Sequence, residues 1–114
     1  MDKSRRKELL REYAERAPSI GIFAVTCAPT GQVWVGWSKA LDKRKNSLWF
    51  QWNAGGDAGA PDVRDAWKAR GADAFSYGIL ETIAEDNPHK LGLLLEERTA
   101  YWRGKLGAGL LPGL

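Results

Sequence analysis

Residues 20–37 read IGIFAVTCAPTGQVWVGW, and this stretch decides the fold. Residues 20–27 are rich in apolar and β-branched side chains, and residues 32–37 alternate in the manner of a strand. Between them, residues 28–31 (APTG) carry turn chemistry, because proline presets φ and glycine accepts a positive φ. The stretch therefore predicts a β-hairpin.

The register of this hairpin brings three side chains onto one face. A symmetric four-residue loop pairs Val25 with Trp34 and Phe23 with Gly36. Because side chains alternate between the faces of a strand, Phe23, Val25 and Trp34 then share a face. The two aromatic residues become diagonal neighbours, which suits either a functional face or ordinary core packing.

The rest of the sequence predicts helices around a third strand. We expect helices over residues 2–16, 39–49, 62–70 and 91–105, a glycine-rich loop over residues 53–61, and a strand over residues 75–82. This order indicates an α+β fold, with a small three-stranded antiparallel sheet flanked by helices. We expect an N-terminal helix over residues 1–17 and a domain over residues 18–114, together forming one compact unit.

Composition is typical of an ordinary globular domain in a reducing compartment. The chain has 114 residues, 44% of them hydrophobic and 27% charged. Its single cysteine, Cys27, has no partner within the chain for a disulfide and lies in an apolar segment. No stretch has the length and hydropathy of a signal peptide or a transmembrane helix. We therefore expect a cytoplasmic protein that does not associate with membranes.

A cluster of cations follows the hairpin directly. Lys39, Lys43, Arg44 and Lys45 fall within seven positions and are opposed by Asp42 alone, in a chain of net charge +3. Such a cluster is typical of a surface that binds phosphate groups, and equally of a solvated helix face. We expect these four cations to bind nucleic acid, most simply DNA.

Three aromatic residues crowd the end of the second predicted helix. Trp49, Phe50 and Trp52 cannot all face the core from one helix, so at least one is expected to be exposed. An exposed aromatic side chain beside lysines can stack on unpaired bases. The alternative is that these side chains cover a sheet edge or a dimer surface.

Two short segments of the hairpin resemble the motifs of the GIY-YIG nuclease family: Gly21-Ile22-Phe23 and Trp34-Val35-Gly36. Arg44 follows ten residues beyond Trp34, as a basic residue does in that family. Phe23 and Trp34 occupy the places of its two tyrosines, eleven residues apart. The resemblance covers most of the chain after Pro18 and implies that residues 18–114 form a GIY-YIG-like nuclease domain. It further implies that Phe23, Trp34 and Arg44 mark the catalytic site, where Arg44 would hold a phosphate.

The resemblance also implies one divalent ion, Mg²⁺ or Mn²⁺, bound by a glutamate on a later helix. Glu96 and Glu97 are the candidates. We prefer Glu97 as the catalytic metal ligand, because Leu93 and Tyr101 lie on its side of the helix and are expected to meet the sheet. An alternative alignment places Thr99 at the metal position, which would remove the ligand.

The sequence departs from the family where the chemistry is most demanding. Phe23 and Trp34 carry neither a hydroxyl group nor a basic atom, so neither can take a proton from water, the role that the resemblance gives to a tyrosine. The asparagine usual near the C-terminus of the family has no match either. Tyr77, Ser38 and His89 are the candidate replacements for the proton acceptor.

Three functions follow from these observations. The resemblance implies an endonuclease that hydrolyses DNA phosphodiester bonds with a divalent metal. The alternative is a catalytically lapsed GIY-YIG-like module that binds nucleic acid or a protein partner, and the third is a basic scaffold without a nucleic-acid role. The positions of Arg44 and Glu97 distinguish the endonuclease from the binding module. If both residues line one cleft with Phe23 and Trp34, the endonuclease is favoured. If Glu97 faces solvent, the binding module is favoured.

Overall fold

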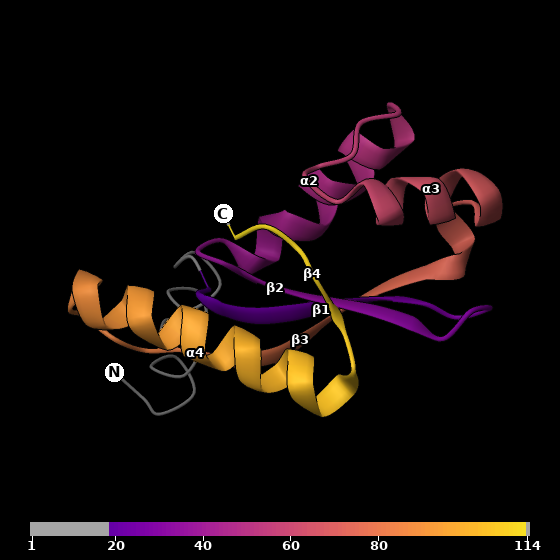
Figure 1. The fold of residues 1–114 in the computed structure, drawn as a ribbon. Coiled ribbons are helices and arrows are strands. Elements are labelled where there is room, and N and C mark those ends of the chain that lie inside the picture. The colour runs from indigo at the N-terminus through magenta and orange to yellow at the C-terminus, as the bar shows by residue number, and fades with distance from the viewer. Residues whose placement is uncertain (1–18, 114) are drawn as a thin grey trace, which may run out of the picture.

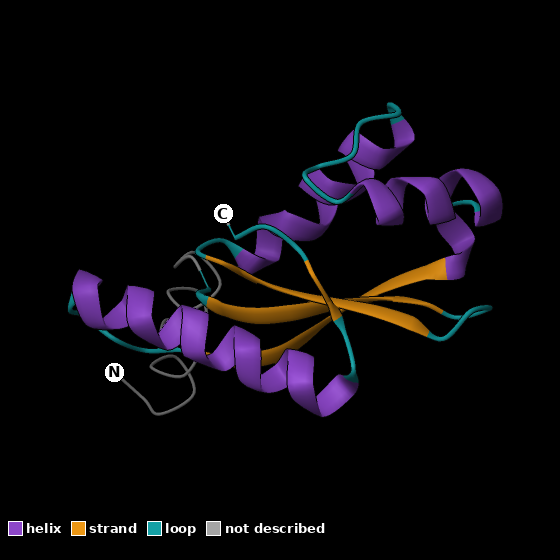
Figure 2. Cartoon of the chain, in the orientation of Figure 1, coloured by secondary structure: helices purple, strands orange, loops and turns teal. Residues whose placement is uncertain are grey.

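The structure is a computed structural model that describes residues 19–113. It contains three α-helices, one short 3₁₀ helix and four strands (Figures 1 and 2). In chain order these are β1 (Gly21–Cys27), β2 (Gln32–Ser38), α2 (Leu41–Asn53), α3 (Pro61–Arg70), η1 (Ala72–Ala74), β3 (Phe75–Thr82), α4 (Pro88–Leu106) and β4 (Gly109–Leu110). The helix predicted over residues 1–17 lies outside the described residues. Within residues 19–113, no helix is both long enough and apolar enough to cross a membrane.

The sheet has the strand order β3-β1-β2-β4 and is mixed. β1 runs antiparallel to β2 and β3, whereas β4 pairs parallel to β2. The α+β class is therefore confirmed, but the expectation of a three-stranded antiparallel sheet is wrong. After α4 the chain turns at Gly107, in the left-handed region with φ 61°, and two residues pair with the free edge of β2. A two-residue strand is too short to give a periodic signal in sequence.

The register of the hairpin is the predicted one. Val25 pairs with Trp34 and Phe23 with Gly36. Phe23, Val25 and Trp34 lie in one buried cluster, which confirms that they share a face of the sheet. The intervening residues of β1, such as Ile22, belong to a second cluster on the opposite face.

The two faces of the sheet are covered by different helices (Figure 1). The cluster of Phe23 receives side chains from α2 and α3, and we call this side of the sheet the α2–α3 face. The opposite cluster receives side chains from α4, and we call it the α4 face. The helix residues buried in the two clusters are Leu41, Leu48, Trp52, Val63 and Trp67 in the first and Leu91 and Leu95 in the second. Each such burial contributes about 1.5–3 kcal/mol, so both layers are needed to hold the sheet.

The glycines of the two motif segments are required by close packing. A Cβ at Gly21 would collide with the carbonyl oxygen of Glu81, beside the irregularity in the β1–β3 pairing. A Cβ at Gly36 would lie 3.0 Å from Leu111 Cβ and 3.1 Å from Phe23 Cζ. Both glycines therefore let neighbouring chain segments approach more closely than any other residue would allow.

Candidate functional site

Phe23 and Trp34, the positions of the family tyrosines, are core residues. Their exposed fractions are 0% and 2%. Phe23 stacks on Tyr77 with ring centroids 5.2 Å apart, and Trp34 stacks on Phe75 at 6.3 Å. The indole Nε1 of Trp34 donates a hydrogen bond to Asp62 Oδ2 at 2.7 Å. These side chains fill the α2–α3 face and offer no free polar atom to a ligand.

Arg44 lies on the buried side of α2 with an exposed fraction of 5%. Its Nη2 donates a hydrogen bond to the carbonyl oxygen of Pro112 at 3.2 Å, and its buried Nε has no hydrogen-bond partner. Burial lowers the pKa of Arg44, and the nearby Tyr77 partly offsets this effect. A guanidinium still carries its charge at neutral pH, so Arg44 is a cation with unused donor capacity.

A pocket of about 210 Å³ opens beside this guanidinium, and we call it the Arg44 pocket. Its lining consists of Ser38, Ala40, Lys43, Arg44 and Ser47. Ser38 uses its Oγ to accept a hydrogen bond from the Ala40 backbone N–H at 2.9 Å, which holds the turn before α2. Arg44 and Lys43 bring two positive charges to this lining, which suits phosphate oxygens, and the Ser47 hydroxyl accepts a hydrogen bond from Gln51 Nε2 at 3.3 Å.

The predicted basic cluster lies on the first turns of α2 and just before it. Lys39, Lys43 and Lys45 are exposed, in contrast to Arg44. Lys45 Nζ lies 5.5 Å from the centroid of the Trp49 ring, so its charge covers an aromatic face. The structure thus supports a basic surface on α2, and nucleic-acid binding by these residues stays a prediction.

The C-terminal segment, residues 111–113, lies against the motif elements. In Figure 1 the chain after α4 crosses the edge of the sheet toward α2. Leu111 is buried in the cluster of Phe23, and its N–H donates a hydrogen bond to the Val35 carbonyl oxygen at 2.9 Å. Pro112 accepts the hydrogen bond from Arg44. An apolar side chain therefore occupies space next to the first motif, where the resemblance places a catalytic cleft.

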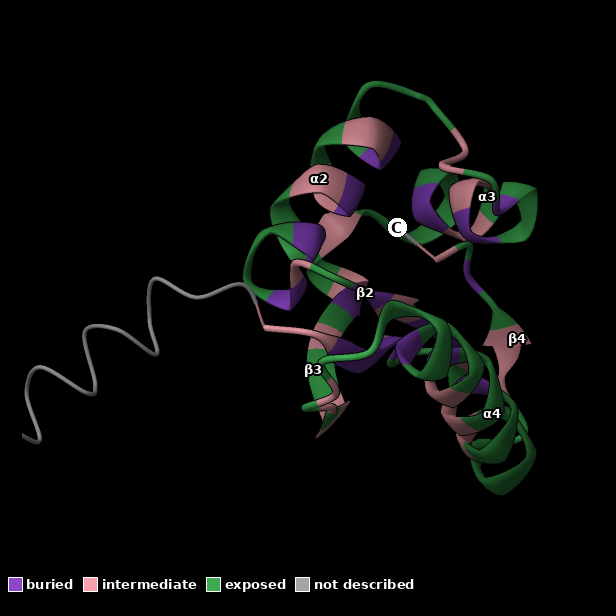
Figure 3. Cartoon of the chain, turned by 90° about the vertical axis from the view of Figure 1, so that its left-hand side faces the viewer, coloured by how far each residue is buried: buried purple, intermediate pink, exposed green. Residues whose placement is uncertain are grey.

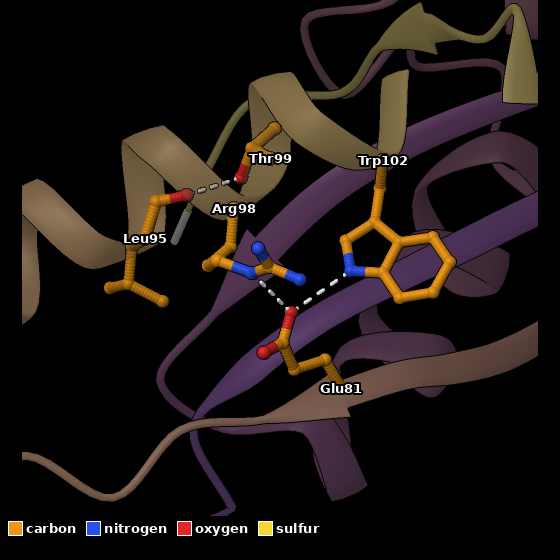
Figure 4. Close-up of polar contacts among 5 residues, drawn as sticks. All are labelled: Glu81, Leu95, Arg98, Thr99 and Trp102. Carbon is orange, nitrogen blue, oxygen red and sulfur yellow. Dashed lines mark hydrogen bonds and ion pairs between the residues drawn. The ribbon is translucent and has the colours of Figure 1, made fainter. Parts of the chain in front are cut away.

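The rotation of α4 is fixed by contacts with the sheet (Figure 4). Glu81 on β3 accepts hydrogen bonds through Oε1 from Arg98 Nε at 2.7 Å and from Trp102 Nε1 at 2.9 Å. The residues of α4 buried against the sheet are spaced four apart: Leu91, Leu95 and Thr99. Figure 3 shows the remaining surface of this helix largely exposed.

This rotation overturns the predicted orientation of Glu97. Leu93 and Tyr101, expected to meet the sheet beside it, are 56% and 47% exposed. Glu97 is itself exposed, on a helix that covers the α4 face and not the α2–α3 face of Phe23 and Trp34. The prediction was wrong because Leu93 and Tyr101 indicated that the side of α4 carrying Glu97 is apolar and buried. The side that is buried carries Leu91, Leu95 and Thr99 instead.

The described residues do not fit the single-metal site that the resemblance implies. Thr99, the alternative at the metal position, is buried, and its hydroxyl donates to the Leu95 carbonyl oxygen at 2.6 Å. Glu96 and Glu97 are exposed on α4. Within residues 19–113 no group of three His, Cys, Asp or Glu side chains is arranged to hold a metal ion. Metal binding by Glu97 stays a prediction.

The candidate replacements for the proton acceptor are not brought to a common cleft. Tyr77 donates its hydroxyl to the Leu41 carbonyl oxygen at 2.8 Å, and burial raises its pKa to about 12. Such a phenol cannot accept a proton from water near neutral pH. Ser38 is buried in the turn before α2, and His89 is exposed at the start of α4.

Two features were missed by the sequence analysis, and a third was anticipated. Asp62, the partner of Trp34, lies 28 positions away, and its only signal is an acidic residue in the first turn of α3. The segment after α4 gave no signal at all.

The expectation that one aromatic of α2 is exposed is confirmed, because Phe50 is 75% exposed whereas Trp52 is buried.

No protein-family model and no curated protein matches this sequence. Solved structures that match include the catalytic domain of homing endonuclease I-TevI, at 22% identity and a TM-score of 0.66, over 77% of this chain and 88% of that chain. A mutant of the catalytic domain of intron endonuclease I-TevI matches with the same identity and TM-score, over 78% of this chain and 84% of that chain. I-TevI is a GIY-YIG homing endonuclease. This likeness confirms the resemblance at the level of the backbone: the chain has a GIY-YIG-like fold.

Proposed function

We propose that the protein is a GIY-YIG-like module that binds nucleic acid, DNA above all, through α2 and has lost the hydrolytic reaction of the fold. One observation carries this proposal. Arg44 and Lys43 share a pocket on α2, while Glu97 is exposed on the helix that covers the opposite face of the sheet. The binding groups are therefore assembled, and the hydrolytic groups are separated.

The Arg44 pocket and its surroundings supply the binding half of the proposal. Arg44 lines this pocket with a permanently charged guanidinium, and such a group suits a phosphate oxygen. Lys43 adds a second charge at the rim, and Lys39 lies just before the helix. Contacts of this kind position a nucleic-acid backbone without reading its sequence.

The distribution of chemical groups over the sheet explains the loss of hydrolysis. Cleavage requires a water activated by a base or metal and a cation on the same phosphate. Phe23 is buried and cannot activate water, and the hydroxyl of Tyr77 is engaged by Leu41. Glu97 and Arg44 belong to helices that cover opposite faces of the sheet, and this arrangement does not favour joint action on one phosphate.

An active metal-dependent endonuclease is the second candidate function. The fold likeness to the I-TevI catalytic domain favours it. The family resemblance implies that this function would use Mg²⁺ or Mn²⁺. The two functions differ in one measurable property, the cleavage of a nucleic acid that the protein binds.

The test compares binding and cleavage on the same labelled DNA. Single-stranded, duplex and branched oligonucleotides are titrated with protein in EDTA, and fluorescence anisotropy reports affinity. The same substrates are then incubated with Mg²⁺ or Mn²⁺ and resolved on a denaturing gel. Salt-dependent binding without cleavage supports the proposal, and metal-dependent cleavage establishes the endonuclease. Absence of binding to every substrate rejects both functions.

A further inference from the structure

The exposed side of α2 carries a row of polar and aromatic residues, which we call the outer stripe. Lys43, Asn46, Phe50 and Asn53 follow one another at intervals of three and four residues, which places them along one side of the helix, and Lys39 lies two residues before the helix begins. All five are exposed. The opposite side of the helix packs on the sheet through Leu41, Arg44, Leu48 and Trp52.

Phe50 is the most exposed large apolar side chain among the described residues, at 75%. Its neighbours in sequence are used by the core: Trp52 is buried, and Trp49 packs edge-on against Trp67 with ring centroids 5.2 Å apart. One exposed apolar residue on a protein surface is ordinary. The informative feature is its setting, because lysines and amides flank it along the same row.

We infer that the outer stripe binds an unpaired segment of nucleic acid, with a base stacked on Phe50 and phosphates held by Lys43 and Lys39. This inference rests on the proposed function and adds the structural class of the ligand. An aromatic ring stacks on any base, since every base has a π-face, but the faces are accessible only where bases are unpaired. A regular duplex would meet the lysines and leave Phe50 without a partner.

The dimensions of the stripe suit a strand that follows the helix. Lys43 and Phe50 are seven residues apart, which corresponds to roughly 10 Å along an α-helix. Successive stacked bases of one strand are about 3.4 Å apart, so this distance spans roughly three nucleotides. Asn46 lies along the same path and offers an amide donor and acceptor to base edges, whereas Asn53 uses its Oδ1 to accept a hydrogen bond from Trp67 Nε1 at 3.1 Å. The Arg44 pocket opens at Lys43, so the backbone of the strand can continue into it.

The charge of the stripe favours a polyanion over a protein partner. Residues 39–53 contain Lys39, Lys43, Arg44 and Lys45 against Asp42 alone. Protein–protein interfaces have charge-depleted centres, and lysine is among the residues depleted there. A single phenylalanine within a lysine-rich row is a weak anchor for a protein and a sufficient platform for one base.

The test uses the whole chain and a pair of substitutions at Phe50. Phe50→Leu keeps an apolar side chain and removes the π-face, whereas Phe50→Trp keeps a ring that stacks. The control is Tyr101→Leu, which removes an aromatic ring that is 47% exposed on the other side of the sheet. The probe is an oligonucleotide containing 2-aminopurine, whose fluorescence falls when the base stacks, together with a duplex of the same sequence.

We expect Phe50→Leu to weaken single-strand binding about 5- to 100-fold, the range for loss of one stacked base. The salt dependence of binding should stay unchanged, the quenching of 2-aminopurine should be lost, and duplex binding should not fall. Phe50→Trp and Tyr101→Leu should bind like the unsubstituted protein. Thermal unfolding of each variant is measured to check that it is folded.

Two results would overturn the inference while leaving the proposed function intact. One is single-strand binding that is unaffected by Phe50→Leu but weakened by Lys43→Ala. The other is tighter binding of duplex than of single strand, with Phe50→Leu weakening the binding of both ligands equally. This result would assign α2 to a groove of double-stranded DNA. If the unsubstituted protein binds no nucleic acid, the proposed function itself is rejected.

Discussion

Arg44 directs one guanidinium donor to the Pro112 carbonyl oxygen and leaves its buried Nε without a partner. A guanidinium carries five N–H donors and stays charged at neutral pH, and the hydrogen bond to Pro112 uses one of these donors. The wall of the pocket that opens beside it contains Lys43 and two serines. At the scale of single residues, the presence of two cations, Arg44 and Lys43, in the lining of one pocket is the strongest indication of an anion ligand.

Arg44→Ala should weaken nucleic-acid binding by about 1–3 kcal/mol, as expected for the loss of a charged hydrogen bond to phosphate. The slope of log affinity against log salt should fall by about 0.9 on duplex or about 0.7 on single strands. The matched control is Lys90→Ala, an exposed cation on α4 that should change neither quantity. Because the substitution also removes the bond to Pro112, denaturant unfolding is measured alongside. An unaltered affinity and salt slope would place Arg44 outside the interface.

Gly36→Ala should destabilise the fold by about 1–3 kcal/mol, because the added methyl group would press on Leu111 and Phe23 at 3.0–3.1 Å. The matched control is Gly78→Ala on β3, where a Cβ would have no neighbour within 4 Å. Urea unfolding of the two variants measures the difference. Equal stabilities would show that residues 111–113 do not pack on the motif as described.

Among the elements, α4 packs on the sheet through Leu91 and Leu95, and one carboxylate of β3 bridges two of its side chains. Glu81 accepts hydrogen bonds from both Arg98 and Trp102, which sets the rotation of the helix (Figure 4). That rotation buries Thr99 and exposes Glu97. The absence of a carboxylate facing the sheet from α4 is therefore a consequence of how this helix docks.

The docking of α4 should depend on pH through Glu81. Its pKa lies below the ordinary value of 4.5, mainly through the hydrogen bond from Arg98 and secondly through that from Trp102. A carboxylate with a lowered folded pKa stabilises the fold above its unfolded pKa, and this stabilisation is lost as pH falls through the folded pKa. Glu81→Gln should therefore be less stable than the unsubstituted protein at neutral pH, and the difference should shrink below about pH 4.5.

Chemical denaturation between pH 3 and 7, a range chosen about the ordinary carboxyl pKa, measures this difference. Glu96→Gln is the control, because it changes an exposed carboxylate on the same helix. A stability difference for Glu81→Gln that is constant across the range would show that the charge of Glu81 does not hold α4.

For the whole molecule, the sheet separates the groups that a nuclease would need to combine. Arg44 belongs to the helix layer of the α2–α3 face and Glu97 to that of the α4 face (Figure 1). Glu97→Gln should therefore leave binding in EDTA within about twofold of the unsubstituted protein, as for other exposed surface changes. Neither protein should cleave labelled DNA in Mg²⁺ or Mn²⁺. Metal-dependent cleavage that disappears in Glu97→Gln would contradict the proposed separation and establish the endonuclease.

Sequence alone was enough to predict the hairpin, its register and the face shared by Phe23, Val25 and Trp34. These features depend on strand alternation and turn chemistry within residues 20–37, so a local pattern is sufficient to predict them. The third strand and the exposure of one aromatic on α2 are also local, since each follows from the composition and period of one element. The spacing of the motifs also indicated the fold. Gly21 and Gly36 belong to these motifs, and a side chain at either position would press on a neighbouring segment.

The tertiary structure alone decided which of the predicted site residues come together. The burial of Arg44 depends on Pro112, 68 positions away, and that of Trp34 on Asp62, 28 positions away. The orientation of Glu97 depends on Glu81, which binds two other residues of its helix. Contacts across such separations leave no trace in the local period of a sequence, because the same helix can dock in several rotations and only the packed sheet selects one.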